Sequence, residues 1–482
     1  MTKALIPILI SIFILLLTSC GGIKDVSGDA KDDALGESDT PVEVPADHYD
    51  AYMCQEETLD NHKVLTIGGV FIPGNIRRAV AEFNEASETR SIEIIDYIDE
   101  YATLEYRAEV FMRLQLELMT GGGPDIIYDH FGWMTNHEVV LDLYPFIDAD
   151  SVLSRSDFFT NLLYALESPV GTLPMIANSF SIRTMVSTER TAGRIQSWTP
   201  SALLKLLEQN RRINEPFGRH IDREQFISQV LWHAGFDFID WDNRTANLDS
   251  DDFISFLKAA MLLPKPLTPE ESFSLPYPGD PELALLLGNQ LLEYVFDFCP
   301  SSYNLFTNIL GDVVVLGVPT STGGVNVLEQ TWQIGINAAS PHSDIAWEFL
   351  RGFMLPTVEI EMFRFPLRID MFNNLIDTLK IPHIEIDSDG NTVEIPIELT
   401  LYREGGRRPR VFKIHAITDD VVDRVLHIID TAVLNRQNVH QQALFSLVDA
   451  DIASFFARER SAEDTARIIQ NRVQTFFNEQ QP

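Results

Sequence analysis

The chain alternates apolar strands with amphipathic helices from Lys63 onward, and this alternation limits its possible folds more than any other feature. Residues 63–67 form a short apolar run, residues 76–83 carry apolar side chains at helical spacing, and residues 91–98 form a second apolar run. A longer helical segment ends at three glycines, and the apolar run of residues 125–129 follows it. Strands and helices that alternate at this spacing are typical of parallel βαβ units. The sequence therefore predicts an α/β fold.

The three glycines, Gly121 to Gly123, raise the question of a phosphate-binding loop. Such a loop reads G-x-x-x-x-G-K-S/T and runs from a strand into a helix, so that the helix N-terminus faces the anion. Here the lysine is missing and the chain runs from a helix into a strand. A nucleotide site is therefore excluded at this position. We expect the glycines to end the preceding helix, because glycine tolerates a left-handed turn.

After Pro145 the pattern becomes mostly helical. The periodicity predicts a closing helix capped at Ser461, and Asp389-Gly390 suggests the turn of a β-hairpin over residues 383–397. A calcium loop is the alternative for Asp387 and Asp389, but the full ligand spacing is absent. The other predicted helices cover residues 155–165, 200–210, 222–234, 250–262 and 281–292, and the predicted strands cover residues 311–319 and 330–340.

The N-terminus has the pattern of an export signal. Lys3 precedes an apolar run from Ala4 to Leu17, and the sequence LTSC that ends at Cys20 resembles a bacterial lipobox. The resemblance implies a signal peptide over residues 1–19, cleavage before Cys20 and attachment of lipid to its sulfur. An uncleaved anchor helix is the alternative. We therefore expect a lipoprotein that is modified with palmitate and anchored at the outer face of the cell membrane.

The next segment, residues 20–61, is acidic and poor in large apolar side chains. Such a segment buries too little surface to offset its chain entropy, so we expect a disordered tether. The whole chain has a formal net charge of −35, which argues against a nucleic-acid partner because phosphate binding needs clustered Lys and Arg. Beyond Cys20 the chain holds Cys54 and Cys299, which leave a single disulfide open as an alternative to two free thiols.

Motifs for catalysis and for metal binding are absent from the sequence. The histidines lack the His-Glu-x-x-His spacing of a zinc helix, and the Gly-x-Ser-x-Gly pattern of a hydrolase does not occur. Pairs of carboxylates do not by themselves indicate a catalytic site, because they are common in so acidic a chain. We therefore expect no cofactor, no metal and no enzyme activity.

Tryptophans provide the remaining signal, because flat apolar rings suit the C–H faces of sugars. Trp198 stands at a helix start and Trp347 lies inside an amphipathic helix, so both are expected in the core. Trp133 and Trp332 are better candidates for a binding site, because both lie where a strand meets a loop.

Four passages, in this order, resemble segments of the extracellular solute-binding proteins of ABC importers, family 1, of the maltose-binding type. They read MTGGGPDIIYDHFGWMTNHEVVLDLYPFID, SPVGTLPMIANSFSIRTMVSTERTAGRIQSWTPSALLKLL, VVVLGVPTSTGGVNVLEQTWQIGINAASPHSDIAWEFLRGFM and, for the late helices, FPLRIDMFNNLID with IIQNRVQTFFNEQ. The resemblance covers most of residues 63–482. It implies a two-lobed periplasmic-binding-protein-like fold (type 2), in which each lobe is a β-sheet flanked by helices and the ligand binds in a cleft between lobes that close by a hinge motion.

By position, the resemblance implies a first lobe of residues 62–172 and 328–365. The second lobe would comprise residues 178–325 and 368–482, with an added hairpin near residues 383–397. The passage RTMVSTERT lacks the usual Tyr-Asn pair, and GGVFIPGN lacks the acidic pair of maltose binders. The ligand is therefore expected to be a carbohydrate, with an oligosaccharide favoured over maltose itself.

The ligand site is expected beyond the carboxyl ends of the strands. The resemblance implies that Trp332 and Trp133 stack on a sugar and that Asp129 and Asn178 bind its hydroxyls. Tyr128, Trp232 and Tyr303 complete the set of candidate side chains.

The expected protein is a monomer that works with ABC transporter permease subunits and is tied to the membrane through Cys20. One alternative is a lipid-anchored sensor or adhesion module that uses the same fold without transport. A second alternative is an extracellular enzyme that acts on glycans.

Overall fold

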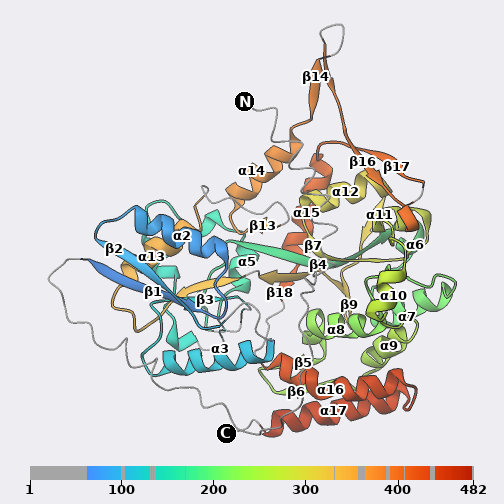
Figure 1. Cartoon of the computed structure of the whole chain (residues 1–482), viewed down its shortest axis with the longest axis horizontal. Helices are drawn as coiled ribbons and strands as arrows, with labels where there is room; N and C mark the ends of the chain where they lie inside the picture. Colours follow the sequence, from blue (N-terminus) through green and yellow to red (C-terminus); the bar gives the residue numbers. More distant parts are fainter. Residues whose placement is uncertain are drawn as a thin grey trace, which may run out of the picture. The chain divides into compact units, whose positions relative to one another are not determined.

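The computed structural model describes residues 62–479, apart from 99–103, 131, 133, 135–136, 169, 331, 356–363, 387–390, 407 and 435–439. Residues 61–482 form one compact unit (Figure 1), and everything below concerns this unit. The expectations for the signal peptide, Cys20, the tether, Cys54 and Trp133 fall on residues outside the described set.

The first sheet has the strand order β12-β3-β1-β2. The strands β1 (Lys63–Gly69), β2 (Arg90–Asp96) and β3 (Ile126–Asp129) are parallel, as the alternation of strands and helices predicts. The edge strand β12 (Gln333–Ile336) pairs antiparallel with β3 and comes from much later in the chain.

Helices cover both faces of the first sheet. Ile76 and Val80 of α2 (Gly74–Glu85) pack in one core cluster with Leu65 and Ile67 of β1, and α13 (Ser343–Gly352) joins the same cluster. The helix α3 (Leu104–Met119) packs on the other face, in a cluster that contains Ile127. Figure 1 shows α3 and α2 on opposite sides of the sheet. This arrangement is the α/β layering that the sequence predicts.

The three glycines Gly121 to Gly123 end α3. The helix stops at Met119, Gly121 takes the left-handed backbone conformation with φ of 79°, and the Gly122 N–H donates to the Glu117 carbonyl at 3.0 Å. The left-handed residue and the backward hydrogen bond are features of a glycine C-cap. The expected structural role of these glycines is confirmed.

The second sheet is built around β4 (Ser179–Thr188), which pairs directly with four other strands. Its neighbour β11 (Val327–Gln330) runs antiparallel to it, with Val327 opposite Arg183. The remaining strands are β7 (Glu293–Phe298), β8 (Val313–Val315), β13 (Phe365–Pro366) and β18 (Val433–Leu434).

The helices next to the second sheet begin at side-chain caps. Thr199 caps α7 (Pro200–Gln209), Asp222 caps α8 (Arg223–His233) and Ser250 caps α9 (Asp251–Ala260), each through its side-chain oxygen. Apolar side chains of these helices form one core cluster with those of α16 (Gln441–Phe456) and α17 (Ala462–Glu479). The Ser461 hydroxyl accepts from the Asp464 N–H at 3.0 Å, as expected for the closing helix.

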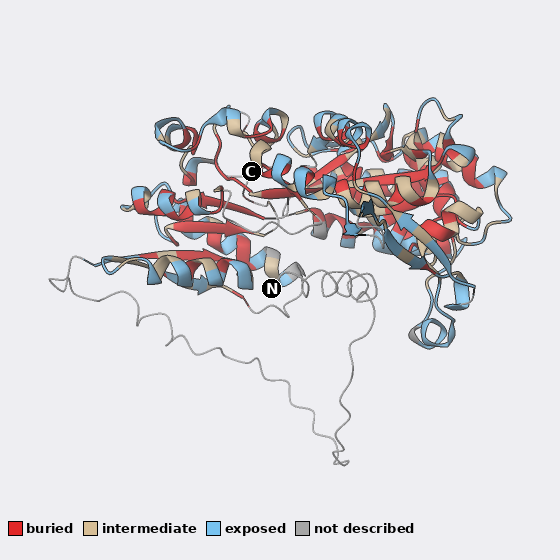
Figure 2. Cartoon of the chain, turned by 90° about the horizontal axis from the view of Figure 1, so that it is seen from above, coloured by how far each residue is buried: buried red, intermediate tan, exposed pale blue. Residues whose placement is uncertain are grey.

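The other helices lie elsewhere around the two sheets. They are α4 (Tyr144–Ala149), α5 (Thr160–Ala165), α6 (Glu189–Ala192), α10 (Pro269–Ser274), α11 (Pro281–Leu287), α12 (Pro300–Leu310), α14 (Ile369–Lys380) and α15 (Asp419–Thr431). Figure 2 shows buried residues along the strands and on the inward sides of the helices.

Two predicted strands are each divided in the structure. Residues 311–319 give β8, which pairs with β4, and β9 (Val318–Thr320), which pairs with β10 (Gly323–Val325). Gly317 separates them at a φ of 77°, and a Cβ at this residue would lie 2.5 Å from the Val325 nitrogen. Residues 330–340 are divided between β11 and β12, which belong to different sheets.

Two predicted helices are shorter than expected. The helix predicted over residues 281–292 ends at Leu287, because Gly288 caps it in the left-handed conformation with φ of 74°. The segment 155–165 contains a short 3-10 turn, Arg155–Asp157, and then α5.

Two antiparallel strand pairs follow α14. The first joins β14 (Ile384–Ile386) to β15 (Thr392–Glu394) where the sequence predicts a hairpin, although the turn at residues 389–390 is outside the described set. The second joins β16 (Ile397–Leu401) to β17 (Arg410–Ile414) and was not predicted.

Over the described part of the chain, no helix is both long and apolar enough to span a membrane. The same residues contain no group of three or more His, Cys, Asp or Glu side chains placed to hold a metal ion.

Candidate ligand-binding site

Three of the predicted site residues meet at the carboxyl edge of the first sheet. Tyr128 and Asp129 end β3, and Asp129 lies opposite Gln333, the residue that follows Trp332. The rings of Tyr128 and Trp332 have centroids 6.0 Å apart. The sheet pairing of β3 with β12 therefore brings together side chains that are distant in the sequence.

All three side chains are buried. Tyr128 has no exposed surface, Asp129 is 1% exposed and Trp332 is 8% exposed. The Asp129 carboxylate accepts from the Met134 N–H at 2.7 Å, and Trp332 packs edge-on against Phe353 at 5.6 Å. Their contact with a ligand stays a prediction, since little of their surface faces solvent in this structure.

Two further residues at this edge were not singled out from the sequence. Phe71 follows β1, is only half-buried and has a φ of 64°, which is unusual for an aromatic residue and typical of functional or strained positions. His130 follows β3, and its ring lies edge-on to Phe71 at 5.7 Å. Burial first, and then the charges of Arg107 and Arg364, lower the pKa of His130 to about 4, so the ring is neutral at physiological pH.

A second group of residues surrounds a cavity of about 260 Å³ beside β4 and β11. Trp232 from α8 and Phe296 from β7 provide its aromatic side chains. Arg183 of β4 and Glu329 of β11 provide opposite charges in the same cavity. The remaining lining residues are Ser228, Gln229 and His233. The predicted candidate Trp232 is therefore part of a real cavity, with its ring also edge-on to Phe445 at 5.8 Å.

The charged side chains of this cavity are held in place by one another. Arg183 forms an ion pair with Glu329 and a second, longer contact of 3.4 Å with Asp297. Its guanidinium also lies 5.6 Å from the centre of the Phe296 ring, within the range of a cation–π contact. This arrangement leaves a polar, preorganised wall beside two aromatic rings.

His233 is the buried histidine in the lining of this cavity. It is 3% exposed, and its Nδ1 lies 2.7 Å from the Tyr294 hydroxyl. Burial and the nearby charge of Arg183 lower its pKa to about 3, whereas the hydrogen bond of its ring to the backbone of Gln229 opposes the shift. The ring is therefore uncharged near neutral pH and acts as a hydrogen-bonding partner of Tyr294.

The other predicted residues do not join either group. Asn178 precedes β4, and its carbonyl accepts from the Leu367 N–H at 2.9 Å. Tyr303 of α12 is 2% exposed, belongs to the main core cluster and packs on Phe298 at 5.4 Å. Cys299 caps α12 and has no disulfide partner among the described residues, while Cys54 lies outside them.

The tryptophans expected in the core are found there. Trp198 is 4% exposed and donates from Nε1 to the Gly317 carbonyl at 3.1 Å. Trp347 is 8% exposed and donates to the Asp150 carboxylate at 3.2 Å. Both indoles satisfy their N–H groups within the protein, as buried tryptophans usually do.

In addition to Phe71 and His130 at the edge of the first sheet, the sequence analysis missed Arg183 and Glu329, the charged residues of the cavity beside β4 and β11. A charged residue inside an apolar strand, as in SFSIRTMV and NVLEQ, is the sequence signal that marks them. Their pairing becomes visible only once the antiparallel register of β4 and β11 is known.

The fold has counterparts among solved structures. No family model matches the chain, and no curated protein matches it by sequence. The sugar-binding protein MalE from Xanthomonas citri aligns over 87% of this chain and 100% of its own, with a TM-score of 0.52 at 11% sequence identity. The chain has the two-lobed solute-binding-protein fold.

Other solute-binding proteins align at lower scores. The ABC substrate-binding protein Lmo0181 from Listeria monocytogenes, in complex with cycloalternan, has a TM-score of 0.48 at 12% identity, over 86% of this chain and 99% of its own. The maltose-bound MalE3 of T. maritima has a TM-score of 0.47 at 12% identity, over the same shares of the two chains. The fold rests on the alignment with the Xanthomonas citri protein alone, and the ligand is argued from the residues of this chain.

Proposed function

We propose that the protein is a lipid-anchored, extracytoplasmic solute-binding protein that captures a carbohydrate and delivers it to the permease of an ABC importer. The solute-binding-protein fold supports the general class. The acidic chain and the lipobox-like LTSC sequence support a location outside the cytoplasmic membrane.

The observation that carries the carbohydrate assignment is the cavity beside β4 and β11. Trp232 and Phe296 offer apolar rings for the C–H face of a sugar, and Arg183 and Glu329 offer a donor and an acceptor for its hydroxyls. Rings and fixed polar groups side by side are the combination that a polyhydroxylated ring requires. Trp332, 8% exposed at the carboxyl edge of the other sheet and backed by the buried Tyr128, is the proposed contact from the first lobe.

The proposed event is capture without bond cleavage. A binding protein needs no general acid, nucleophile or metal, and the two opposite charges of the cavity, Arg183 and Glu329, are paired with each other. If the purified protein cleaved an oligosaccharide, the proposal would fail in favour of a glycan-active enzyme.

Calorimetric titration of the mature protein with a panel of neutral mono- and oligosaccharides tests the ligand class. We expect saturable binding of at least one carbohydrate, weakened in Trp232→Ala. Binding of peptides with no response to any carbohydrate would overturn the assignment.

Two further experiments test the anchor and the partner. Metabolic labelling with an alkyne fatty acid should label the wild-type chain and leave Cys20→Ala unlabelled. A deletion strain should lose uptake of the bound sugar if the protein serves an importer. Normal uptake together with lost transcriptional or adhesive responses would favour the sensor or adhesion alternative.

A further inference from the structure

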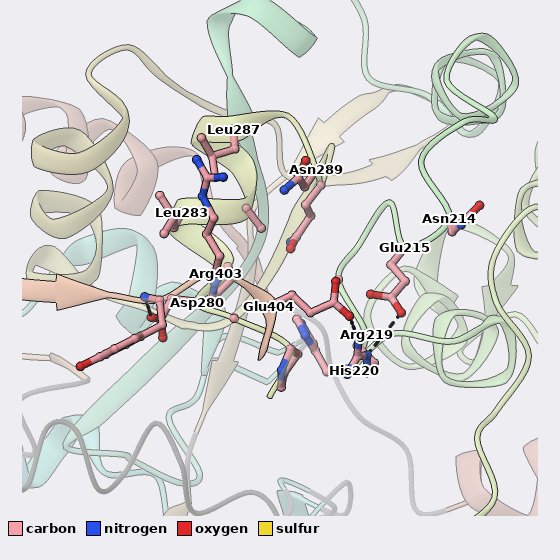
Figure 3. Close-up of a pocket in the computed structure, with 17 residues that line it drawn as sticks. Asn214, Glu215, Arg219, His220, Asp280, Leu283, Leu287, Asn289, Arg403 and Glu404 are labelled. Carbon is pink, nitrogen blue, oxygen red and sulfur yellow. Dashed lines mark hydrogen bonds and ion pairs between the residues drawn. The ribbon is translucent and has the colours of Figure 1, made fainter. Parts of the chain in front are cut away.

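A second cavity lies away from β4 and β11, where the strand pair β16–β17 meets two loops. Its volume is about 460 Å³, larger than that of the cavity beside Trp232, and no residue lines both. The walls come from residues 214–220, from residues 278–290 and from residues 402–404. Figure 3 shows these three segments around one space.

Backbone hydrogen bonds fix the walls relative to one another. The Asp280 N–H donates to the Tyr402 carbonyl at 2.9 Å, and the Gly405 N–H donates to the Tyr277 carbonyl at 2.7 Å. The N–H groups of Leu291 and Leu292 both donate to the Pro216 carbonyl. The cavity is therefore a preformed feature of the fold rather than a gap between mobile loops.

A close approach at Gly279 also shapes this cavity. Its φ is 90°, and a Cβ added there would lie 2.7 Å from the Glu404 nitrogen. Only glycine lets the loop contact the end of β16 so closely.

Five of the six charged side chains that line the cavity have hydrogen-bonding partners. Arg219 donates to Glu404 at 2.7 Å and to Glu215 at 3.3 Å (Figure 3). His220 lies 3.3 Å from Glu293, and Asp280 accepts from the Tyr277 hydroxyl at 2.6 Å. Each of these charges is thus already compensated or hydrogen-bonded within the protein.

Arg403 is the exception among these described lining residues. Its Nε is buried and has no hydrogen-bond partner, and no ion pair joins its guanidinium to the described part of the chain. Figure 3 shows its side chain alongside Leu283 and Leu287 of α11. A buried donor without a partner costs about 1–3 kcal/mol, so such a group is usually explained by a ligand or an ordered solvent molecule.

The rest of the lining suits a small molecule with one anionic group. The side-chain amide of Asn289 makes no hydrogen bond to described residues and remains available to a ligand, whereas Asn214 lies at the opposite end of the cavity from Arg403 (Figure 3). The partly exposed Leu287 offers apolar surface next to Arg403, while Leu283 beneath it is buried. The planar fork of arginine matches the two oxygens of a carboxylate.

We propose that this cavity is a second ligand site, in which Arg403 binds the carboxylate of a small molecule and Asn289 binds its polar body. The carboxylates of Glu215, Asp280 and Glu404 line the same cavity, so a dianionic phosphate would meet more repulsion than a carboxylate does. The two sources of such a carboxylate are a sugar acid and an amino acid or peptide end.

The test compares each carboxylate with its neutral counterpart by calorimetry on the folded protein. D-glucuronate is compared with D-glucose, and N-acetyl-L-alanine with its amide. We expect one of the two carboxylates to bind, at least tenfold more tightly than its counterpart, and the one that binds identifies the source. Binding of neither carboxylate, or tighter binding of inorganic phosphate, would overturn the proposal.

Variants at Arg403 test whether the carboxylate binds to this side chain. Arg403→Gln should weaken the carboxylate at least tenfold, and Arg403→Lys should weaken it less because the charge remains while the fork is lost. Trp232→Ala serves as the matched control, since it lies in the other cavity and should leave this affinity unchanged. Equal affinity of wild type and Arg403→Gln, with both folded by circular dichroism, would exclude Arg403 as the binding group.

The two proposals fail independently. Loss of carbohydrate binding in Trp232→Ala bears on the first cavity alone, and loss of carboxylate binding in Arg403→Gln bears on the second alone.

Discussion

The guanidinium of Arg183 on β4 is paired with the carboxylate of Glu329 on β11, across two antiparallel strands of the second sheet. Glu329 lies opposite Ser181, so the pair is a diagonal cross-strand contact on one face. Each side chain is 17% exposed. The pair therefore joins two passages that are distant in the sequence and lines the cavity of Trp232 at the same time.

Removal of one partner of this pair should destabilise the fold. Glu329→Ala leaves a mostly buried guanidinium with only the longer contact to Asp297, and we expect a loss of about 1–3 kcal/mol in the free energy of unfolding, less than for a fully buried pair because of the remaining solvent screening. The measurement is urea denaturation. Arg467→Ala is the control, because its pair with Asp464 is more than half exposed and should contribute about 0–0.5 kcal/mol. Equal losses in the two variants would show that burial does not strengthen the Arg183 pair.

Trp232 and Trp241 offer a matched test of the aromatic contact. Both are half-buried, but Trp232 lines the cavity whereas Trp241 packs against Phe477 of α17. We expect Trp232→Ala to weaken carbohydrate binding by about 1–3 kcal/mol and Trp241→Ala to leave the affinity unchanged. Calorimetry on the two folded variants checks this. A similar loss in both would point to general destabilisation rather than to stacking.

Trp332 should behave differently from Trp232. Its indole packs between Tyr128 and Phe353 and is 8% exposed, so Trp332→Ala removes core volume. We expect a loss of about 3–5 kcal/mol in stability, measured by urea denaturation. Trp332→Phe should retain most of that stability. A Trp332→Ala variant with wild-type stability and weakened carbohydrate binding would instead identify the ring as a stacking platform.

We expect the protein to lose stability in mild acid, because burial lowers the pKa values of two histidines. The pKa of His233 is lowered to about 3 in the folded state, from a usual value near 6.5, so the unfolded chain takes up the proton first. The contribution of the neutral His233 ring to the free energy of unfolding is complete above about pH 6.5 and is lost as the pH falls from about 6.5 toward 3. His130, with a pKa lowered to about 4, acts in the same direction.

The test is the pH dependence of the unfolding free energy over that range. His233→Gln should flatten the decline, because its amide does not titrate, whereas Tyr294→Phe keeps the buried imidazole and should keep the decline. An unchanged slope in His233→Gln would show that other groups dominate acid unfolding.

Alanine substitutions at two glycines distinguish the stability cost of steric crowding from the cost of an unfavourable backbone conformation. Gly317 and Gly121 have similar positive φ angles, 77° and 79°. A Cβ at Gly317 would lie 2.5 Å from the Val325 nitrogen, while a Cβ at Gly121 would meet nothing within 4 Å. We expect Gly121→Ala to cost about 1 kcal/mol and Gly317→Ala about 3 kcal/mol or more in unfolding free energy. Similar costs would mean that the loop at Val325 yields to the methyl group.

The sequence predicted the first sheet better than the second. The parallel strands β1, β2 and β3 follow from local alternation, because each is an apolar run separated from the next by a helix. The division of residues 330–340 between two sheets was not predictable, since it depends on pairing with β4 and β3 from elsewhere in the chain. Local periodicity does not report which distant strand a segment will join.

The candidate site was also only partly predictable, because its residues come together through contacts between distant parts of the chain. Trp232 was proposed from its residue type, and its cavity appears only where α8 meets β7 and β4. The burial of Tyr303 was not foreseen, because it depends on Phe298 and the core around α12. Arg183 and Glu329 each stand alone in the sequence and become a pair only through strand register.

The late position of β12 has a consequence for how the chain is made. β3 cannot acquire its outer partner until Gln333–Ile336 has emerged, and by then everything from β4 to β11 has already been synthesised. Until that point the first sheet has an unpaired edge along β3, and open edges are prone to wrong pairing. Nascent-chain contacts that span so many residues also form slowly. A chain of this topology therefore gains from a holding chaperone during translation.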